Sequence, residues 1–454
     1  MPCILVHYIL DYIHELYALY VNERSMDKGT NKFGRFDYLK ISILGFALTG
    51  LAGSMNSIIL PIRLLDFLEE SQKNTFLGLL TFAGLVLAMI TQPIIGAISD
   101  RSSFKWGRRR PYILIGTILV LLFLPGIGLV GSFTGILLVY CMLQISSNTA
   151  QAPYQAFIPD LVPQNIRGRA SGVKNVLEIL GGIALMRLAA FLMERYFGHG
   201  EDYWLWMALG ALAVVFLVTG LFTVLAVKEQ TVTGSPRLPL STVYKSFKID
   251  LKHHGFGWFL AARAVLGIPG VVLQIFALYY LMDYIGIANP AAAAGDLLVV
   301  VGVCLLAMVY PAGRLSDKIG RKPVVVFSGF LGALGVVSLF FSQNYTSIML
   351  SGALLGIANG ILLSSSWALA TDLAPMGEEA RYLGVTNLAM AGGSALARLI
   401  GPAIDFFNNI HSGLGYQVML LVCFISFVVG ALLIIKVKQN EPRQPQRKLK
   451  RAVS

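Results

Sequence analysis

Long apolar stretches alternate with short polar segments along most of this chain. Each stretch has at least roughly the 20 residues that a helix needs to cross the hydrocarbon core of a bilayer. Because lipid offers no hydrogen bonds to the backbone, the α-helix is the expected structure of each stretch. The pattern therefore predicts an all-α membrane protein with twelve transmembrane helices. The predicted spans are 41–62, 75–98, 111–131, 134–159, 170–193, 204–227, 256–282, 293–312, 323–342, 345–371, 382–404 and 414–435.

The composition agrees with this pattern. The 454 residues are 56% hydrophobic and 13% charged, whereas soluble domains carry about 25% charged residues. So few charges exclude a soluble enzyme, a nucleic-acid-binding protein and a disordered chain. The net charge of +12 then indicates basic loops beside anionic lipid headgroups. We find no hydrolase, metalloprotease, phosphate-loop or Cys/His metal motif, and we expect no enzyme activity, no cofactor and no metal.

Charge alternates between consecutive loops. Basic residues such as Arg108 and Arg321 follow even-numbered spans, whereas acidic residues such as Glu69 and Asp283 follow odd-numbered spans. The positive-inside rule places the basic loops, and with them both termini, in the cytoplasm. We therefore expect a multi-pass protein of the cell membrane, plasma or inner, with an even number of spans.

The longest polar segment between spans divides the chain into two sets of six. The expected organisation is an N-terminal cytoplasmic extension at 1–37, a six-helix bundle at 38–227, a cytoplasmic linker at 228–255, a second six-helix bundle at 256–436 and a basic cytoplasmic tail at 437–454.

The two halves share sequence patterns. Gly96-Ala-Ile-Ser-Asp100-Arg101 precedes Gly107-Arg108-Arg109-Arg110-Pro111, and Gly313-Arg-Leu-Ser-Asp317-Lys318 precedes Gly320-Arg321-Lys322-Pro323. A longer match begins at Asp160-Leu-Val-Pro163 and Asp372-Leu-Ala-Pro375, which are 212 residues apart. At the same offset Arg169, Gly172, Asn175 and Gly181 match Arg381, Gly384, Asn387 and Gly393. This agreement indicates duplication of a six-span unit, and it predicts two pseudo-symmetric bundles with a site between them near the membrane midplane.

The loop pattern Gly-x-x-x-Asp-Arg/Lys…Gly-Arg-Arg/Lys, found after the second span of each half, resembles the signature of the major facilitator superfamily. Its longer form, from Ser99-Asp100-Arg101 to Trp106-Gly107-Arg108-Arg109-Arg110-Pro111, is similar to that of glycoside–pentoside–hexuronide:cation symporters and sucrose–proton symporters. The resemblance implies the major facilitator fold and a monomer. It also implies alternating-access transport of a sugar, glycoside or related small polar solute, coupled to a proton or sodium ion.

The repeated loops form a candidate cytoplasmic gate. An aspartate beside clustered arginines at a helix end can form ion pairs with neighbouring helices, and glycines permit a close approach. By resemblance, such pairs hold the outward-facing state and break on inward opening; alternatively, the arginines only anchor the topology. The candidate gate residues are Gly96, Asp100, Arg101, Gly107, Arg108, Arg109, Arg110, Asp160, Gly313, Asp317, Gly320, Arg321 and Asp372.

Polar residues inside the spans are the candidates for substrate binding. Four amides of the fourth span, from Gln144 to Gln155, recur at helical spacing on one face. Amides donate and accept hydrogen bonds, which suits hydroxyl-rich ligands, and helix–helix hydrogen bonding is the alternative. Trp367 can stack on a sugar ring or simply pack between helices. The candidate substrate residues are Asn56, Gln144, Asn148, Gln151, Gln155, Arg263, Gln274, Asn359, Ser366, Trp367 and Arg398.

Charged residues inside the spans usually face a cavity or one another. The predicted spans contain five that we assign to the membrane interior: Lys174, Glu178, Arg187, Arg263 and Arg398. Glu178, four residues after Lys174, is the candidate for ion coupling, with a static ion pair as the alternative. Arg187 and Arg398 can hold an anionic substrate or pair with carboxylates near the outer ends of the spans, such as Asp66, Asp283 and Asp405.

These five charges sum to +3, which leaves a second hypothesis open: an exporter or organic-anion carrier of the same fold. A third hypothesis is a membrane sensor or assembly factor that uses the fold without transport. A multi-pass membrane enzyme is disfavoured, because no catalytic constellation is visible. The expected partners are a small-molecule substrate, a coupling cation and the lipid bilayer, without nucleic acid.

Overall fold

The structure, a computed structural model, describes residues 34–104, 106–229, 255–375 and 378–437. Within these ranges it contains helices and no β-strand, and twelve helical segments are long and apolar enough to cross a membrane. The predicted architecture and span number are thus confirmed. The largest boundary difference is at the eighth span, which ends at Ile319 rather than at 312. The predicted N-terminal extension up to residue 33, most of the predicted linker and the tail from residue 438 lie outside the described residues.

The first six spans combine long helices with short continuations. They are built from α2 (Arg35–Ser54), the π-helical η1 (Met55–Ile59) and α3 (Leu60–Leu65); α4 (Lys73–Arg101); α5 (Arg110–Phe123) and α6 (Gly126–Leu129); α7 (Phe133–Gln155) and α8 (Phe157–Leu161); α9 (Arg167–His199); and α10 (Asp202–Ala226). Short 3-10 turns, η2 (Glu70–Gln72) and η3 (Gln164–Ile166), precede α4 and α9.

The second six spans follow the same plan. They are α12 (Phe256–Tyr279) with the π-helical η5 (Tyr280–Tyr284); α13 (Pro290–Ile319); α14 (Arg321–Phe340); α15 (Tyr345–Leu373); α16 (Glu379–Arg398) with α17 (Gly401–Ile410); and α18 (Leu414–Ile435). The first span of each half thus contains a π-helical segment. Such segments are rare and occur often at functional sites.

Matching glycines let matching helices touch in the two halves. A Cβ atom at Gly181 of α9 would lie 2.1 Å from the carbonyl oxygen of Phe46 in α2. A Cβ atom at Gly393 of α16 would lie 2.2 Å from the carbonyl oxygen of Ala264 in α12. The fifth span therefore packs on the first as the eleventh packs on the seventh, which is the arrangement expected for a duplicated unit.

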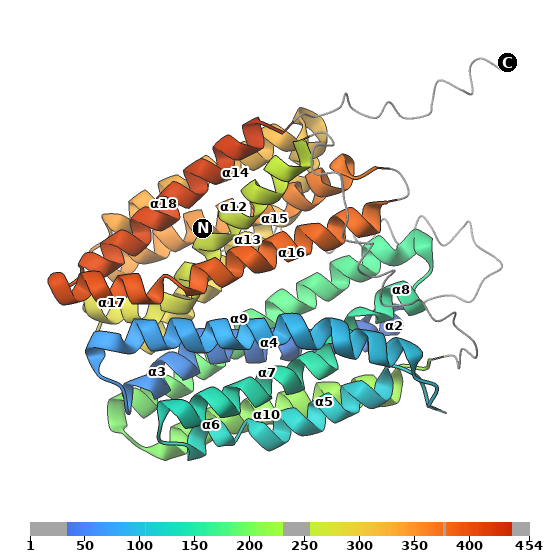
Figure 1. Ribbon diagram of the computed structural model, residues 1–454, viewed down its shortest axis with the longest axis horizontal. Coiled ribbons are helices and arrows are strands. Elements are labelled where there is room, and N and C mark those ends of the chain that lie inside the picture. Colours follow the sequence, from blue (N-terminus) through green and yellow to red (C-terminus); the bar gives the residue numbers. More distant parts are fainter. Residues whose placement is uncertain (1–33, 105, 230–254, 376–377, 438–454) are drawn as a thin grey trace.

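The helices form two bundles, α2–α10 and α12–α18 (Figure 1). We call the end of the molecule that holds Arg108 and Arg321 the basic end, and the end that holds Asp66 and Asp405 the far end. In Figure 1 the two bundles are closest where α17 and α3 lie, at the far end, and diverge toward α8, at the basic end.

Atomic contacts agree with this view. At the far end, Cβ atoms at Gly78 and Gly401 would lie 2.4 Å and 2.2 Å from backbone oxygens of the opposite bundle, those of Arg398 and Asn74. The same helices lose contact toward the basic end, where Cβ atoms at Gly96 of α4 and Gly384 of α16 would meet nothing within 4 Å. The bundles are therefore closed against each other at the far end and apart at the basic end.

The outer surface of the bundles is apolar. The third and sixth spans expose large aliphatic side chains in rows, such as Ile118 and Leu122 of α5 and Val214 and Val218 of α10. The ninth and twelfth spans do the same, for example with Leu334 of α14. Rows of this kind suit contact with lipid, because lipid tails are as apolar as these side chains.

We predict that Gly181→Ala and Gly393→Ala each lower the melting temperature of the purified protein in detergent. The added methyl group would overlap a backbone oxygen in both cases, and overpacking of this kind costs about 1–3 kcal/mol. Gly172→Ala and Gly384→Ala are the matched controls, since they are also related by the repeat and have open space. The controls should be neutral or slightly stabilising, because Ala favours helix over Gly. Equal losses in all four variants would contradict the prediction.

Candidate functional site

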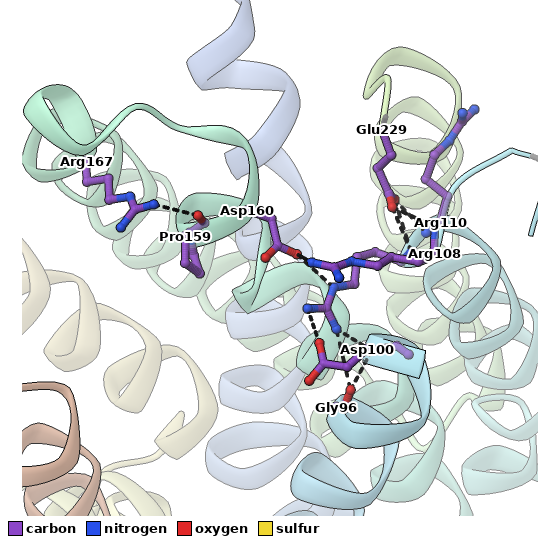
Figure 2. Close-up of polar contacts among 10 residues, drawn as sticks. Gly96, Asp100, Arg108, Arg110, Pro159, Asp160, Arg167 and Glu229 are labelled. Atoms are coloured by element: carbon purple, nitrogen blue, oxygen red, sulfur yellow. Dashed lines mark hydrogen bonds and ion pairs between the residues drawn. The ribbon is translucent and has the colours of Figure 1, made fainter. Parts of the chain in front are cut away.

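Asp100, Arg108 and Asp160 form an ion-pair cluster at the basic end (Figure 2), and Arg109 contacts both aspartates. Its Nε atom donates to Oδ2 of Asp160 at 3.0 Å and its Nη1 atom to the hydroxyl of Ser99 at 2.6 Å. Its Nη2 atom pairs with Asp100, and Arg108 pairs with Asp160 at 2.8 Å. The Arg109 side chain is buried, so these contacts join the ends of α4, α5 and α8 in a protected place.

Glu229 caps the start of α5 in the same cluster (Figure 2). Its carboxylate accepts the backbone N–H groups of Arg108, Arg109 and Arg110 at 2.7, 3.0 and 3.0 Å. A carboxylate at a helix N-terminus satisfies unpaired donors and complements the helix dipole. Gly107, with φ +123°, makes the approach possible, because a Cβ atom there would lie 2.9 Å from the Glu229 carboxyl carbon. Glu229 was not a candidate from the sequence, because it lies far along the chain, at the start of the predicted linker.

The contacts of Arg110 differ from the prediction that its side chain forms ion pairs in the gate. Its side chain donates to the backbone oxygens of Val224 and Trp106, and its guanidinium lies 5.8 Å from the centre of the Trp106 ring. Successive residues of a helix point about 100° apart, so Arg110 reaches α10 while Arg109 reaches the aspartates. Arg101 lies exposed at the end of α4.

The second half repeats this arrangement. Arg321 donates from Nε to Asp372 at 3.0 Å and lies 3.6 Å from Asp317, as Arg109 contacts Asp160 and Asp100. Gly320, with φ +97°, makes the turn before α14. Lys322 donates to backbone oxygens of Ile435 and Val437 at the end of α18, as Arg110 does at the end of α10. Gly313 lies within α13, where a Cβ atom would lie 3.1 Å from the Ser364 hydroxyl of the same bundle.

Each of these pairs joins helices of one half. Arg109 pairs with Asp100 and Asp160 of the first half, and Arg321 with Asp317 and Asp372 of the second. The pairs are intact although the bundles lie apart at this end. This corrects the expectation that they break when this end opens, and the reason is that they do not cross the interface.

Polar contacts between the bundles gather at the far end instead. Lys73 of α4 pairs with Asp283 of η5 at 2.8 Å. Asp405 of α17 accepts the side-chain N–H of Asn74 at 2.8 Å and the backbone N–H of Thr75 at 2.6 Å. Both Lys73 and Asp405 are buried. These contacts close the far end with groups that were expected to lie in or beside loops.

Of the two arginines that we expected to hold an anionic substrate or to pair with an outer carboxylate, Arg187 has a carboxylate partner. Arg187 pairs with Asp296 of α13 at 2.8 Å, which is a further contact between the bundles. Asp66 pairs with Arg63 of its own half. Neither Arg187 nor Arg398 contacts Asp66, Asp283 or Asp405 in the part of the chain that the structure describes.

The amides of the fourth span divide into two groups. Asn148 is buried; it accepts from Gln92 of α4 at 2.7 Å and donates to the Gln144 backbone at 2.7 Å. Its side chain therefore serves helix packing. Gln144 donates to the Tyr140 hydroxyl, which donates to Oδ1 of Asn56 at 2.6 Å. Gln151 is half-buried and Gln155 is exposed.

Glu178 lies between the first, fourth and fifth spans. Its carboxylate is 3.6 Å from Lys174 and 3.5 Å from the Tyr154 hydroxyl, which donates to the Ser42 carbonyl at 3.0 Å. Gly45 makes room, since a Cβ atom there would lie 2.3 Å from the Tyr154 hydroxyl. The side chain of Glu178 keeps 27% of its surface exposed, so the chain does not cover it fully.

In the second half, Arg263 of α12 donates to the hydroxyl of Ser366, and its guanidinium lies 5.2 Å from the centre of the Trp367 ring. The face of the Trp367 ring is therefore in contact with the Arg263 guanidinium. Asn359 donates to the Leu355 backbone at 2.9 Å, and Gln274 is half-buried. Arg398 donates to the Ser394 backbone at 2.7 Å. Among the described residues, no three His, Cys, Asp or Glu side chains gather to hold a metal ion.

The family model for MFS/sugar transport proteins matches residues 44–400. The chain belongs to the major facilitator superfamily. The minor myo-inositol transporter IolF of Bacillus subtilis (strain 168) is 25% identical over a stretch that spans 37% of each chain. The multidrug resistance protein MdtG of Klebsiella pneumoniae (strain 342) is 22% identical over 84% of this chain and 93% of its own.

Solved structures of the superfamily share the fold. The D-xylose-proton symporter superposes with a TM-score of 0.66 and 19% identity, covering 89% of this chain and 98% of its own. A mutant form of the nucleoside transporter NupG superposes with a TM-score of 0.71 and 14% identity, covering 88% and 99%. The protein is therefore a multi-pass membrane transporter of the superfamily, with a small-molecule substrate, and not an enzyme.

We predict that Asp405→Asn opens the far end. The amide would present an N–H where the carboxylate accepts backbone and side-chain donors, and an unsatisfied buried donor costs about 1–3 kcal/mol. Spin labels at Glu70 and Ser412, both exposed, should report longer distances in pulsed electron paramagnetic resonance. The control Asp66→Asn breaks a pair within one half and should leave the distances unchanged. Unchanged distances in Asp405→Asn would refute the assignment.

Proposed function

We propose that the protein is a secondary active transporter that moves a small polar solute, a sugar or glycoside, by alternating access coupled to a proton or sodium ion. The observation that carries the proposal is the uneven interface: contacts between bundles gather at the far end, while matching helices lose contact at the basic end. A fold of two bundles closed at one end only is suited to rocking about a site between them.

The charge pattern indicates which end of the molecule faces the cytoplasm. With the basic loops and both termini in the cytoplasm of a cell-membrane protein, the open basic end faces inward. Return to the outward-facing state then requires the Lys73–Asp283 and Arg187–Asp296 pairs to break. The ion-pair clusters around Arg109 and Arg321 keep each half rigid during this movement, because they contact only their own half. We take the monomer as the working unit.

The polar residues within the spans favour a hydroxyl-rich solute. Gln144, Gln151, Gln274 and Asn359 are only partly buried, and amides can donate and accept hydrogen bonds to sugar hydroxyls. The D-xylose-proton symporter and the myo-inositol transporter among the similar proteins support this solute class. MdtG keeps export open as an alternative direction.

Glu178 is our candidate for the coupling group. A carboxylate shared between Lys174 and Tyr154 can exchange the lysine for a proton or sodium ion. Glu178 belongs to α9 and lies beside Gly45 of α2 and Tyr154 of α7. A change in its charge therefore acts on three helices. A change of binding partner at such a position is what coupling requires, since an ion shifts a conformational equilibrium only through different affinities for the two states.

We predict that Glu178→Gln abolishes gradient-driven accumulation of solute in proteoliposomes but retains exchange of solute across the membrane. The neutral amide cannot take up or release the coupling cation, whereas the solute-binding amides are unchanged. Glu194→Gln, on the same helix, is the matched control and should accumulate solute as the wild type does. Wild-type accumulation by Glu178→Gln would overturn the coupling assignment. Failure of the wild type to accumulate any solute of a panel of sugars, glycosides and sugar acids would overturn the proposed function.

A further inference from the structure

Arg263 stands apart from the other buried cations of the protein. Its side chain is 5% exposed, and while Nη1 contacts the Ser366 hydroxyl, Nε and Nη2 are buried without a hydrogen-bond partner. The other deeply buried basic side chains that the structure describes, Arg63, Lys73 and Arg109, each pair with a carboxylate. Arg263 has no such pair among the described residues.

An unpaired guanidinium in this position is costly. Arginine keeps its charge in proteins, and removing one partner of a buried ion pair is strongly destabilising, because a buried charge is then left uncompensated. The expected site for such a cation in a transporter is a substrate path. The missing counter-ion is therefore best supplied by a molecule that is not part of the chain.

The first half has no charge at the place equivalent to Arg263. Gly181 packs beside Phe46, and Gly393 packs beside Ala264, so Arg263 takes the place that Gly45 has in the first half. Tyr154 and Ser366, which those two residues contact, are 212 residues apart, the offset of the repeat. In the first half, Gly45 leaves room for Tyr154 and Glu178. In the second half, Arg263 fills the equivalent space and donates to Ser366.

Open space lies along the face of α12 that carries Arg263. Gly267, Gly270 and Gln274 follow Arg263 at spacings that place them on one stripe of α12. A Cβ atom at Gly267 would meet nothing within 4 Å, and at Gly270 the nearest atom is Oδ1 of Asn359 at 3.7 Å. A change of rotamer that moves the guanidinium about one helical turn toward Gly267 would bring its buried Nε and Nη2 donors into this space.

We propose that Arg263 binds the carboxylate of the transported solute, so that within the proposed solute class the substrate is a sugar acid or related hydroxylated carboxylate rather than a neutral sugar. Trp367 lies over one face of the guanidinium, so the in-plane Nε and Nη2 donors, which have no partner among the described residues, can make a two-point contact with a carboxylate. Asn359 and Gln274 then face the hydroxyl groups. This inference rests on the proposed transport function and narrows its solute class.

The test compares matched acids and neutral polyols on the purified protein. Thermal stability is measured with gluconate, glucuronate, quinate and glycerate, each beside glucose or glycerol as its neutral counterpart. At least one acid should stabilise the wild type more than its counterpart does. Arg263→Gln should bind that acid roughly 10- to 100-fold more weakly, and Arg263→Lys should be intermediate. Lys318→Gln, exposed at the end of α13, should behave as the wild type.

Arg263→Gln should also raise the melting temperature of the ligand-free protein, because it removes a buried unpaired charge. This readout separates loss of binding from misfolding. No preference for any acid in the wild type, or an equal preference in Arg263→Gln, overturns the inference.

Uptake into proteoliposomes separates this inference from the proposed function. Gradient-driven uptake of a neutral sugar that Arg263→Gln leaves unchanged would refute the carboxylate site while supporting coupled transport. Binding of an acid that depends on Arg263 without gradient-driven uptake would support the site and refute coupled transport.

Discussion

A charged side chain inside a helix bundle in a membrane is stable only where another group balances its charge, because lipid cannot. The pairs that meet this requirement here fall into two classes. Arg109 with Asp160 and Arg321 with Asp372 join helices of one half. Lys73 with Asp283, and Arg187 with Asp296, join helices of different halves. A pair of the first class is unaffected when the halves move as rigid units, whereas a pair of the second class must break if the halves separate at that place.

The pairs around Arg109 and Arg321 lie at the basic end, whereas the pairs between the halves lie toward the far end. The two ends therefore have different tasks. At the basic end, Arg109 and the Glu229 cap fix α4, α5, α8 and the end of α10 to one another. At the far end, Asp405 accepts hydrogen bonds from α4 across the interface. Rigid units need strong internal contacts, and an interface that opens needs contacts of limited strength. The ion pairs within each half supply the first kind of contact, and the pairs between the halves supply the second.

Hydropathy and loop charge were sufficient to predict the spans and their number, because the length of an apolar helix and the thickness of a bilayer set both. The pairing of each aspartate with an arginine of its own half followed from the repeat. Contacts between remote segments could not be read from the sequence. Lys73 and Asp283 are 210 residues apart, and Glu229 lies 120 residues from Arg109, so nothing local marks either contact.

Side-chain direction also limited the prediction. The amide stripe of the fourth span was visible in its spacing, but only the neighbouring helices decide that Asn148 faces Gln92 while Gln155 faces outward. In the same way, the spacing that marked Arg110 for the gate could not show that it turns to the Val224 carbonyl. A helical pattern specifies a face, and the packing of other elements determines what that face meets.

The two halves have kept the fold of their common unit while acquiring opposite charges at equivalent depth. The first half holds Glu178, the proposed site for the coupling cation, beside Gly45. The second half holds Arg263, the proposed site for the solute carboxylate, at the place equivalent to that glycine. A carrier that binds one cation in one half and one carboxylate in the other moves no net charge when loaded. Moving a single charge against the membrane potential costs about 2.3 kcal/mol per 100 mV, so paired loading would make the loaded step insensitive to that potential. The divergence of these two positions is therefore what coupling of an anionic solute to a cation would require of a duplicated fold.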